Sequence, residues 1–81
     1  MAKTFHLTIA RVGETLFDGE ALSVSLPGAE GVFTVLANHE PYVSELKTGE
    51  AKVRTPDGAQ QTFPLIRGVA EVSKNQATVL L

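Results

Sequence analysis

The sequence predicts an all-β protein, an antiparallel sandwich or barrel, and three observations favour this fold class. Apolar and polar residues alternate with a period of two along much of the chain. Turn signals recur about every 8–12 residues, as they do between short antiparallel strands. No window has the apolar spacing of an amphipathic helix. With 81 residues, 43% of them hydrophobic, the chain is long enough for one small core. We therefore expect a single domain over residues 1–81.

The expected strands follow from the alternation. Phe5, Leu7 and Ile9 alternate with more polar neighbours, which predicts a strand with one buried face. In residues 51–54 the same pattern places Lys52 and Arg54 on the solvent side. The other expected strands are residues 21–26, 32–36, 62–66, 69–73 and 77–81. Residues 42–46 are compatible with either a strand or an irregular crossing.

The breaks between these strands contain turn residues. Residues 55–59 combine a proline with Asp-Gly, which predicts a hairpin tip. Residues 27–31 and 74–76 are two further expected turns. Pro64 lies inside a predicted strand and cannot donate to a ladder, so we expect an edge strand or a bulge there.

Composition excludes several classes of function. There are no cysteines, which excludes a disulfide scaffold, a thiolate zinc site and a cysteine nucleophile. Seven basic residues stand against nine acidic ones, and the basic residues are scattered. A nucleic-acid-binding surface needs a basic stripe, so no nucleic-acid partner is expected. No apolar run is long enough to cross a bilayer.

The search for catalytic chemistry gives no candidate. His6 and His39 lack metal-ligating neighbours at a suitable spacing, and we expect His6 on the solvent face of its strand. No nucleophile motif is present, and the Gly-Ala-Glu-Gly run at 28–31 lacks the lysine of a phosphate-binding loop. We therefore predict no catalytic residue, no metal and no cofactor, and a protein that is not an enzyme.

Five motifs, in this order along the whole chain, resemble one known family. They are Phe5-His6-Leu7-Thr8-Ile9, Leu16-Phe17-Asp18-Gly19, Pro27-Gly28-Ala29-Glu30-Gly31, Asn38-His39-Glu40-Pro41 and Arg67-Gly68-Val69-Ala70-Glu71-Val72. Together they are similar to the N-terminal domain of the epsilon subunit of F-type ATP synthase. The resemblance implies a flattened antiparallel β-sandwich of two roughly five-stranded sheets.

The resemblance also implies a function. Domains of this kind are non-catalytic parts of the central stalk that bind the gamma subunit and the c-ring and couple ion translocation to ATP synthesis. The implied location is peripheral, on the cytoplasmic face of the bacterial inner (plasma) membrane, with membrane association only through the complex. Family members usually continue into a C-terminal pair of inhibitory helices; here residues 79–81 close the sequence, and we expect a subunit without those helices.

The expected interface residues come from the same resemblance. Glu30 matches a residue of the loop that contacts the ring, and Val32 stands where the family often has an acidic residue. His39 matches a loop histidine of the family that lies close to the gamma side. Glu40 stands where the family has a small residue, and Pro41 matches a proline of the family. For each, an ordinary solvated loop residue is the alternative interpretation.

A second hypothesis, from another class, is a free-standing β-sandwich module that binds carbohydrate or peptide. It requires exposed aromatic side chains on one sheet face, whereas the central-stalk hypothesis requires an apolar or mixed docking patch.

Overall fold

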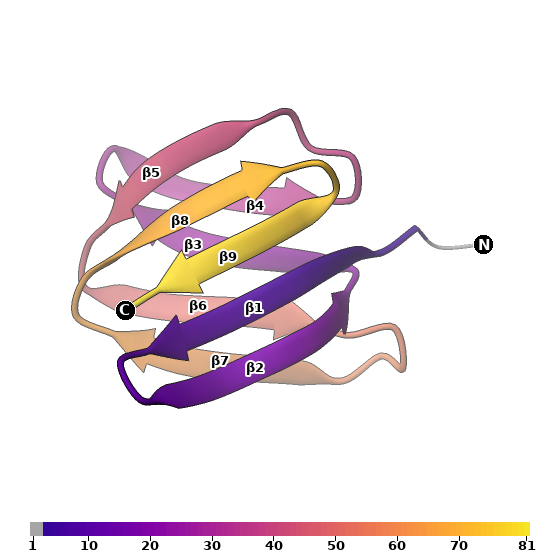
Figure 1. Cartoon of the computed structure of the whole chain (residues 1–81), viewed down its shortest axis with the longest axis horizontal. Helices are drawn as coiled ribbons and strands as arrows, with labels where there is room; N and C mark the ends of the chain where they lie inside the picture. Colours follow the sequence, from indigo (N-terminus) through magenta and orange to yellow (C-terminus); the bar gives the residue numbers. More distant parts are fainter. Residues whose placement is uncertain (1–2) are drawn as a thin grey trace.

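The computed structural model describes residues 3–81, so the first two residues of the predicted domain lie outside the described part. It contains nine β-strands and no helix in that part (Figure 1). The strands are β1 (Phe5–Arg11), β2 (Glu14–Ala21), β3 (Ser23–Gly28), β4 (Gly31–Leu36), β5 (Tyr42–Leu46), β6 (Gly49–Arg54), β7 (Gln60–Leu65), β8 (Gly68–Ser73) and β9 (Gln76–Leu80). Accordingly, residues 3–81 include no helix that could span a membrane.

The strands form one hydrogen-bonded sheet that folds over into two layers. Its order is β2-β1-β9-β8-β5-β3-β6-β7, with β4 paired to the other edge of β3. One layer holds β2, β1, β9, β8 and β5, and the other holds β4, β3, β6 and β7 (Figure 1). The layers are joined where Gly28 pairs with Leu46. The molecule measures 34 × 24 × 20 Å, so the predicted flattened sandwich is confirmed, with five and four strands in its layers.

The first and last strands lie side by side. β1 and β9 pair in parallel, from His6 with Gln76 to Ala10 with Leu80, and all other ladders are antiparallel among the described strands. A register shift between Ile9 and Ala10 forms a bulge that leaves Leu16 of β2 without a ladder partner. This bulge bends the outer hairpin of the five-stranded layer.

The core lies between the layers and follows the predicted alternation. The largest fully buried side chains are Phe5, Leu7, Ile9, Leu26, Val24, Val35, Val53 and Val79. Lys52 and Arg54 are exposed, as predicted, while the alternating residues Ala51 and Val53 are buried. The chain has no Trp, and the core is made largely of branched aliphatic residues contributed by both layers.

Three predicted turns are present, two of them shorter than expected. At 55–59 the Thr55 amide donates to the Ala59 carbonyl (3.0 Å) and Gly58 has a φ of 89°. At 74–75 both residues have positive φ, so β8 and β9 are joined by a two-residue turn. At 27–31 only residues 29 and 30 form the turn, because residues 27 and 28 continue β3 and residue 31 begins β4.

Other differences from the sequence prediction concern single elements. The segment left open, residues 42–46, is the strand β5. The strand β2 was not predicted. Ile66, which the alternation placed in a strand, lies in the exposed β7–β8 connection. Pro64 lies in β7, which is an edge strand, as predicted.

Candidate functional site

The five predicted interface residues all lie on β4 or on the loops at its two ends. Glu30 is in the two-residue β3–β4 turn, and Val32 is on β4. His39, Glu40 and Pro41 are in the β4–β5 loop. Since each residue of a strand advances the chain by about 3.4 Å, the length of β4 separates the two groups by roughly 17 Å. The structure therefore brings Glu30 near Val32 and separates the backbone of both from that of His39 along β4.

The β3–β4 turn is held tightly against β5. The Ala29 amide donates to the Glu45 carbonyl (2.8 Å), and the Lys47 amide donates to the Pro27 carbonyl (2.9 Å). A Cβ at Gly28 would lie 2.7 Å from the Gly31 carbonyl oxygen and 2.9 Å from the Phe33 ring. Glycine at position 28 thus lets the Phe33 ring pack directly against the turn that carries Glu30.

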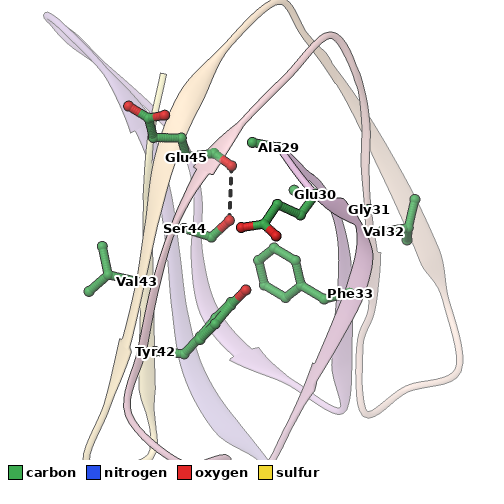
Figure 2. A pocket seen from close by; sticks show the side chains of 10 residues that line it. Ala29, Glu30, Gly31, Val32, Phe33, Tyr42, Val43, Ser44 and Glu45 are labelled. Carbon is green, nitrogen blue, oxygen red and sulfur yellow. Dashed lines mark hydrogen bonds between the residues drawn. The ribbon is translucent and has the colours of Figure 1, made fainter.

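A shallow pocket lies between this turn and β5 (Figure 2). Its lining residues are Gly28, Ala29, Glu30, Gly31, Val32, Phe33, Tyr42, Val43, Ser44 and Glu45. The rings of Phe33 and Tyr42 meet edge to face, with centroids 5.2 Å apart and planes at 77°. Figure 2 shows the Glu30 carboxylate turned inward toward Phe33, Tyr42 and Ser44, whereas Val32 points away on the opposite side of β4.

The β4–β5 loop has a defined conformation. Asn38 has a φ of 62°, and the His39 amide donates to the Leu36 carbonyl (3.2 Å). His39 Nδ1 lies 2.6 Å from the Glu40 carbonyl oxygen, which can only accept, so Nδ1 is the donor. Neutral His39 then presents Nε2 as an acceptor. The His39 ring also lies against Tyr42, with centroids 6.2 Å apart.

One end of the sandwich has exposed apolar side chains at its loop tips. The register places four connections at this end, residues 12–13, 29–30, 47–48 and 66–67, with Ala10 beside Leu80 and Leu46 beside Gly68 (Figure 1). Val12 is 99% exposed and Ile66 78%. We call Val12, Glu30, Val32 and Ile66 the loop-end surface.

A second exposed apolar surface lies on the outer face of the five-stranded layer. Val69 of β8 pairs directly with Leu80 of β9, and Val43 of β5 is the diagonal neighbour of Val69 because it pairs with Glu71. All three apolar side chains are exposed. We call Val43, Val69 and Leu80 the outer apolar patch. Two exposed glutamates lie among them, because Glu45 pairs with Val69 and Glu71 with Val43. Exposed patches of apolar and polar side chains together can form a protein-binding surface.

The other histidine lies in a separate surface network. His6 is half-exposed on the outer face, as predicted, with Nε2 2.6 Å from Asp18 Oδ1 and Nδ1 3.5 Å from Glu20 Oε2. Its two ring nitrogens thus face different carboxylates, and Thr4 donates to Glu20 as well (2.7 Å). Within residues 3–81 no group of three metal-ligating side chains is placed to hold an ion.

Comparison with known proteins assigns the family. The family model described as "ATP synthase, Delta/Epsilon chain, beta-sandwich domain" matches residues 4–81. The chain belongs to this family. The resemblance carried by the five sequence motifs is thereby confirmed.

Curated relatives of this delta/epsilon-chain domain are ATP synthase epsilon chains. The domain is 44% identical over 77 residues to that of Rhodopseudomonas palustris strain BisB5, covering 95% of this chain and 56% of the relative. It is 38% identical over 78 residues to that of Chlorobaculum tepidum, covering 96% of this chain and 89% of the relative. The chain thus spans little more than half of the first relative and most of the second.

Solved structures share the fold of the delta/epsilon-chain domain. A chain of the Euglena gracilis mitochondrial ATP synthase, in an assembly of OSCP, F1 and c-ring, superimposes with a TM-score of 0.89 at 24% identity, covering 95% of this chain and 49% of that one. A chain of the Tetrahymena thermophila mitochondrial ATP synthase central stalk and c-ring gives 0.79 at 12% identity, covering 96% and 63%.

Several surface residues of the delta/epsilon-chain domain were not predicted as interface residues. The outer apolar patch had a signal in the sequence, because Val69 and Leu80 fall at the outward positions of predicted strands. No feature of the sequence marked Val12 or Ile66 as a surface residue of interest, since isolated apolar residues in loops are common. The pairing of Phe33 with Tyr42 depends on how the two layers meet, which alternation does not specify.

Proposed function

We propose that this domain is a non-catalytic central-stalk subunit of an F-type ATP synthase, which binds the gamma subunit and the c-ring and couples ion translocation to ATP synthesis. The observation that carries the proposal is membership of the delta/epsilon family over residues 4–81. Two separate exposed surfaces support it, because a subunit placed between two partners needs one surface for each.

The outer apolar patch is the proposed gamma-binding surface. Val43, Val69 and Leu80 offer apolar area that association would remove from water. The loop of His39, Glu40 and Pro41 leads directly into β5, which carries Val43, and would extend this surface. His39 Nε2 is then available to accept a hydrogen bond from the partner.

The loop-end surface is the proposed contact with the c-ring. Glu30 is exposed at the tip of a two-residue turn whose backbone is tied to β5, so its position is fixed. Val12, Val32 and Ile66 add exposed apolar side chains at the same end of the sandwich. A carboxylate in such surroundings suits the cationic polar loops that we expect the ring to present.

In this proposal the complex holds the domain at the membrane. We place it on the cytoplasmic face of the bacterial inner membrane, peripheral and attached only through its partners. We assign it no active site and no cofactor of its own. The proposal concerns the β-sandwich and makes no use of the helical segment known in longer family members.

The test is binding of this chain to the gamma subunit and, separately, to the detergent-solubilised c-ring of the same organism. We expect Val69→Asp to weaken gamma binding at least about tenfold, since a charge would be buried without a partner. We expect Glu30→Lys to weaken ring binding and leave gamma binding unchanged. Lys52→Ala, on the outer face of the four-stranded layer, is the matched control and should change neither.

Failure of the folded domain to bind either partner at micromolar concentration would contradict the proposal. The alternative, a free-standing module that binds carbohydrate or peptide, needs an aromatic platform. Among the large hydrophobic residues exposed in the described part, Tyr42 is the only aromatic one, and its ring packs against Phe33. We therefore do not propose it.

A further inference from the structure

Both aspartates of the chain are followed by glycine, as Asp18-Gly19 and Asp57-Gly58. An aspartate before a glycine can isomerise without an enzyme, because a residue that has no side chain leaves its amide nitrogen open to the preceding carboxyl group. The product is isoaspartate, in which the main chain runs through the side-chain carbon Cγ. Since the two pairs have the same sequence, the backbone around each pair decides whether it reacts.

The reaction closes a five-membered ring and then opens it with water. The glycine nitrogen attacks Cγ of the aspartic acid, a C–N bond forms, and the carboxyl OH leaves as water together with the amide hydrogen. Water then adds to the main-chain carbonyl carbon of this succinimide and breaks the bond from that carbon to nitrogen, which frees an α-carboxylate. The mass of the chain is therefore unchanged, and water is the only other reactant.

The pair Asp18-Gly19 is held in a geometry that prevents ring closure. Its two residues belong to β2 and pair with Thr8 and Leu7 of β1. In an antiparallel strand ψ is about +135°, and Cγ reaches the next nitrogen only after ψ leaves the β region. The carboxylate is also engaged, since Asp18 Oδ1 lies 2.6 Å from His6 Nε2. We therefore expect Asp18 to stay aspartate while the domain is folded.

The pair Asp57-Gly58 lies at the tip of the β6–β7 hairpin, beyond the last ladder pair of these strands. The Gly58 amide closes the turn by donating to the Thr55 carbonyl (3.0 Å), so Pro56 and Asp57 are its central residues. Residues 56–58 are exposed, and the tip lies at the end of the sandwich opposite the loop-end surface (Figure 1). The ψ of Asp57 can therefore change without opening a ladder or the core.

Hydrogen bonds to and from Thr55 slow the reaction at this tip. The Thr55 hydroxyl and the Ala59 amide donate to the Asp57 carboxylate and hold the pKa of that carboxyl below its ordinary value. The group is thereby kept ionised, and a carboxylate is a much poorer electrophile than a carboxylic acid. The Gly58 amide must also release the Thr55 carbonyl before its nitrogen can attack. Both protections are lost when the tip opens, and exposed turns are among the first parts of a fold to open.

We propose that Asp57 is the isoaspartate-forming site of this domain and that the Thr55 hydroxyl limits the rate of its isomerisation. The change inserts Cβ into the main chain of a tight turn and moves the carboxylate to the α position. The modified tip then lacks the side-chain hydrogen bonds to Thr55 and Ala59 that hold the hairpin turn. This inference concerns the turn alone and does not depend on the partners proposed above.

Trypsin separates the two aspartates, which makes the test direct. Cleavage after lysine and arginine places Asp57 in the peptide of residues 55–67 and Asp18 in the peptide of residues 12–47. The purified domain is incubated for weeks at neutral pH and physiological temperature and then digested. Isoaspartate appears as a new chromatographic peak of unchanged mass, which resists a protease that cleaves before aspartate but not before isoaspartate. We expect this peak for the peptide 55–67 and not for the peptide 12–47.

Variants and denaturant identify the cause. Thr55→Val should raise the rate at Asp57 about fivefold, the factor that corresponds to the loss of one ordinary hydrogen bond. Thr55→Ser keeps the hydroxyl and is the matched control, so it should react at the original rate. Asp57→Glu should remove the peak, because closure would need a six-membered ring. In guanidinium chloride, where neither strand nor turn is present, isoaspartate should form in both peptides.

The outcomes decide the site and the role of Thr55 separately. Isoaspartate at equal rates in both peptides of the folded domain, or in neither, would overturn the assignment of Asp57. Equal rates in Thr55→Val and Thr55→Ser would overturn the role of the hydroxyl. Circular dichroism before and after incubation checks that each variant stays folded. Since no partner takes part, none of these results changes the standing of the central-stalk proposal.

Discussion

The side chain of Asn75 accepts a hydrogen bond from the backbone amide of Asn38, 37 residues away in the chain (2.7 Å). The same side chain donates to the Thr4 carbonyl (2.9 Å), and the Asn75 carbonyl accepts from the His6 amide (3.2 Å). The β8–β9 turn therefore fixes both the start of β1 and the loop that holds His39. A residue in a turn thus determines the position of a predicted interface loop.

Replacing Asn75 tests this role. Asn75→Gly preserves the positive φ of 58° but removes both side-chain hydrogen bonds, so we expect a loss of about 1 kcal/mol in the free energy of unfolding. Urea unfolding followed by circular dichroism measures it. Lys74→Gly, next to it in the turn with a φ of 49°, is the control and should be neutral or slightly stabilising. An equal loss in both variants would show that the turn backbone alone matters.

Gly68 is required by a close approach of two strands. A Cβ there would lie 2.5 Å from the Leu80 carbonyl oxygen and 2.9 Å from Leu81 Cδ2. We expect Gly68→Ala to lower the free energy of unfolding by about 1–3 kcal/mol, because backbone must shift to admit it. Gly19→Ala has open space around the new Cβ and should cost little. Thermal unfolding of the two variants in parallel decides the question, and equal melting temperatures would refute the steric argument.

The core prediction contrasts a buried with an exposed apolar residue. Leu7 is fully buried on the core side of β1, so Leu7→Ala should cost about 2–5 kcal/mol. Val12, at the tip of the β1–β2 hairpin, is almost completely exposed, and Val12→Ala should change stability by less than about 0.5 kcal/mol. Chemical denaturation measures both, and a comparable loss from Val12→Ala would mean that this tip packs against the domain.

We expect the stability of the 55–59 hairpin to depend on pH. Hydrogen bonds from the Thr55 hydroxyl and the Ala59 amide to Asp57 hold the pKa of that carboxyl below its ordinary value. Because the folded pKa is lowered, the stabilisation is present above the unfolded pKa and is lost as pH falls below about 4. An NMR titration of the Asp57 carboxyl should show the lowered midpoint, and Thr55→Val should raise it. A midpoint unaffected by Thr55→Val would exclude the hydroxyl as the main cause.

Most of the fold was predictable because one face of most strands is buried, and burial forces alternation. The strand β2 was not predicted because its apolar residues Leu16 and Phe17 are adjacent and do not alternate with polar ones. The bulge opposite Ile9 also interrupts the register of β2 with β1. β5 stayed ambiguous because Val43 is apolar yet exposed, which obscures the alternation of its neighbours. That exposed valine is part of the proposed gamma-binding surface.

The interface residues were less predictable for a physical reason. What binds a partner depends on the partner's surface, which the chain does not encode, and so Glu30, Val32, His39, Glu40 and Pro41 stay predictions. Their arrangement does follow from the structure, since the length of β4 separates the first two from the last three. The pocket of Phe33 and Tyr42 arises from two strands in different layers, which no local pattern in the sequence brings together.

The parallel pairing of β1 with β9 has a consequence for synthesis on the ribosome. β1 is made first, yet its ladder partner between His6 and Ala10 is supplied by residues 76–80, so the five-stranded layer lacks its middle strand until these emerge. Contacts so distant along the chain carry a large loop-closure entropy and slow the folding of small β-proteins. The nascent domain therefore remains incomplete until β9 has left the exit tunnel, and a chain stalled before residue 76 would expose β1 and β8 as open edges.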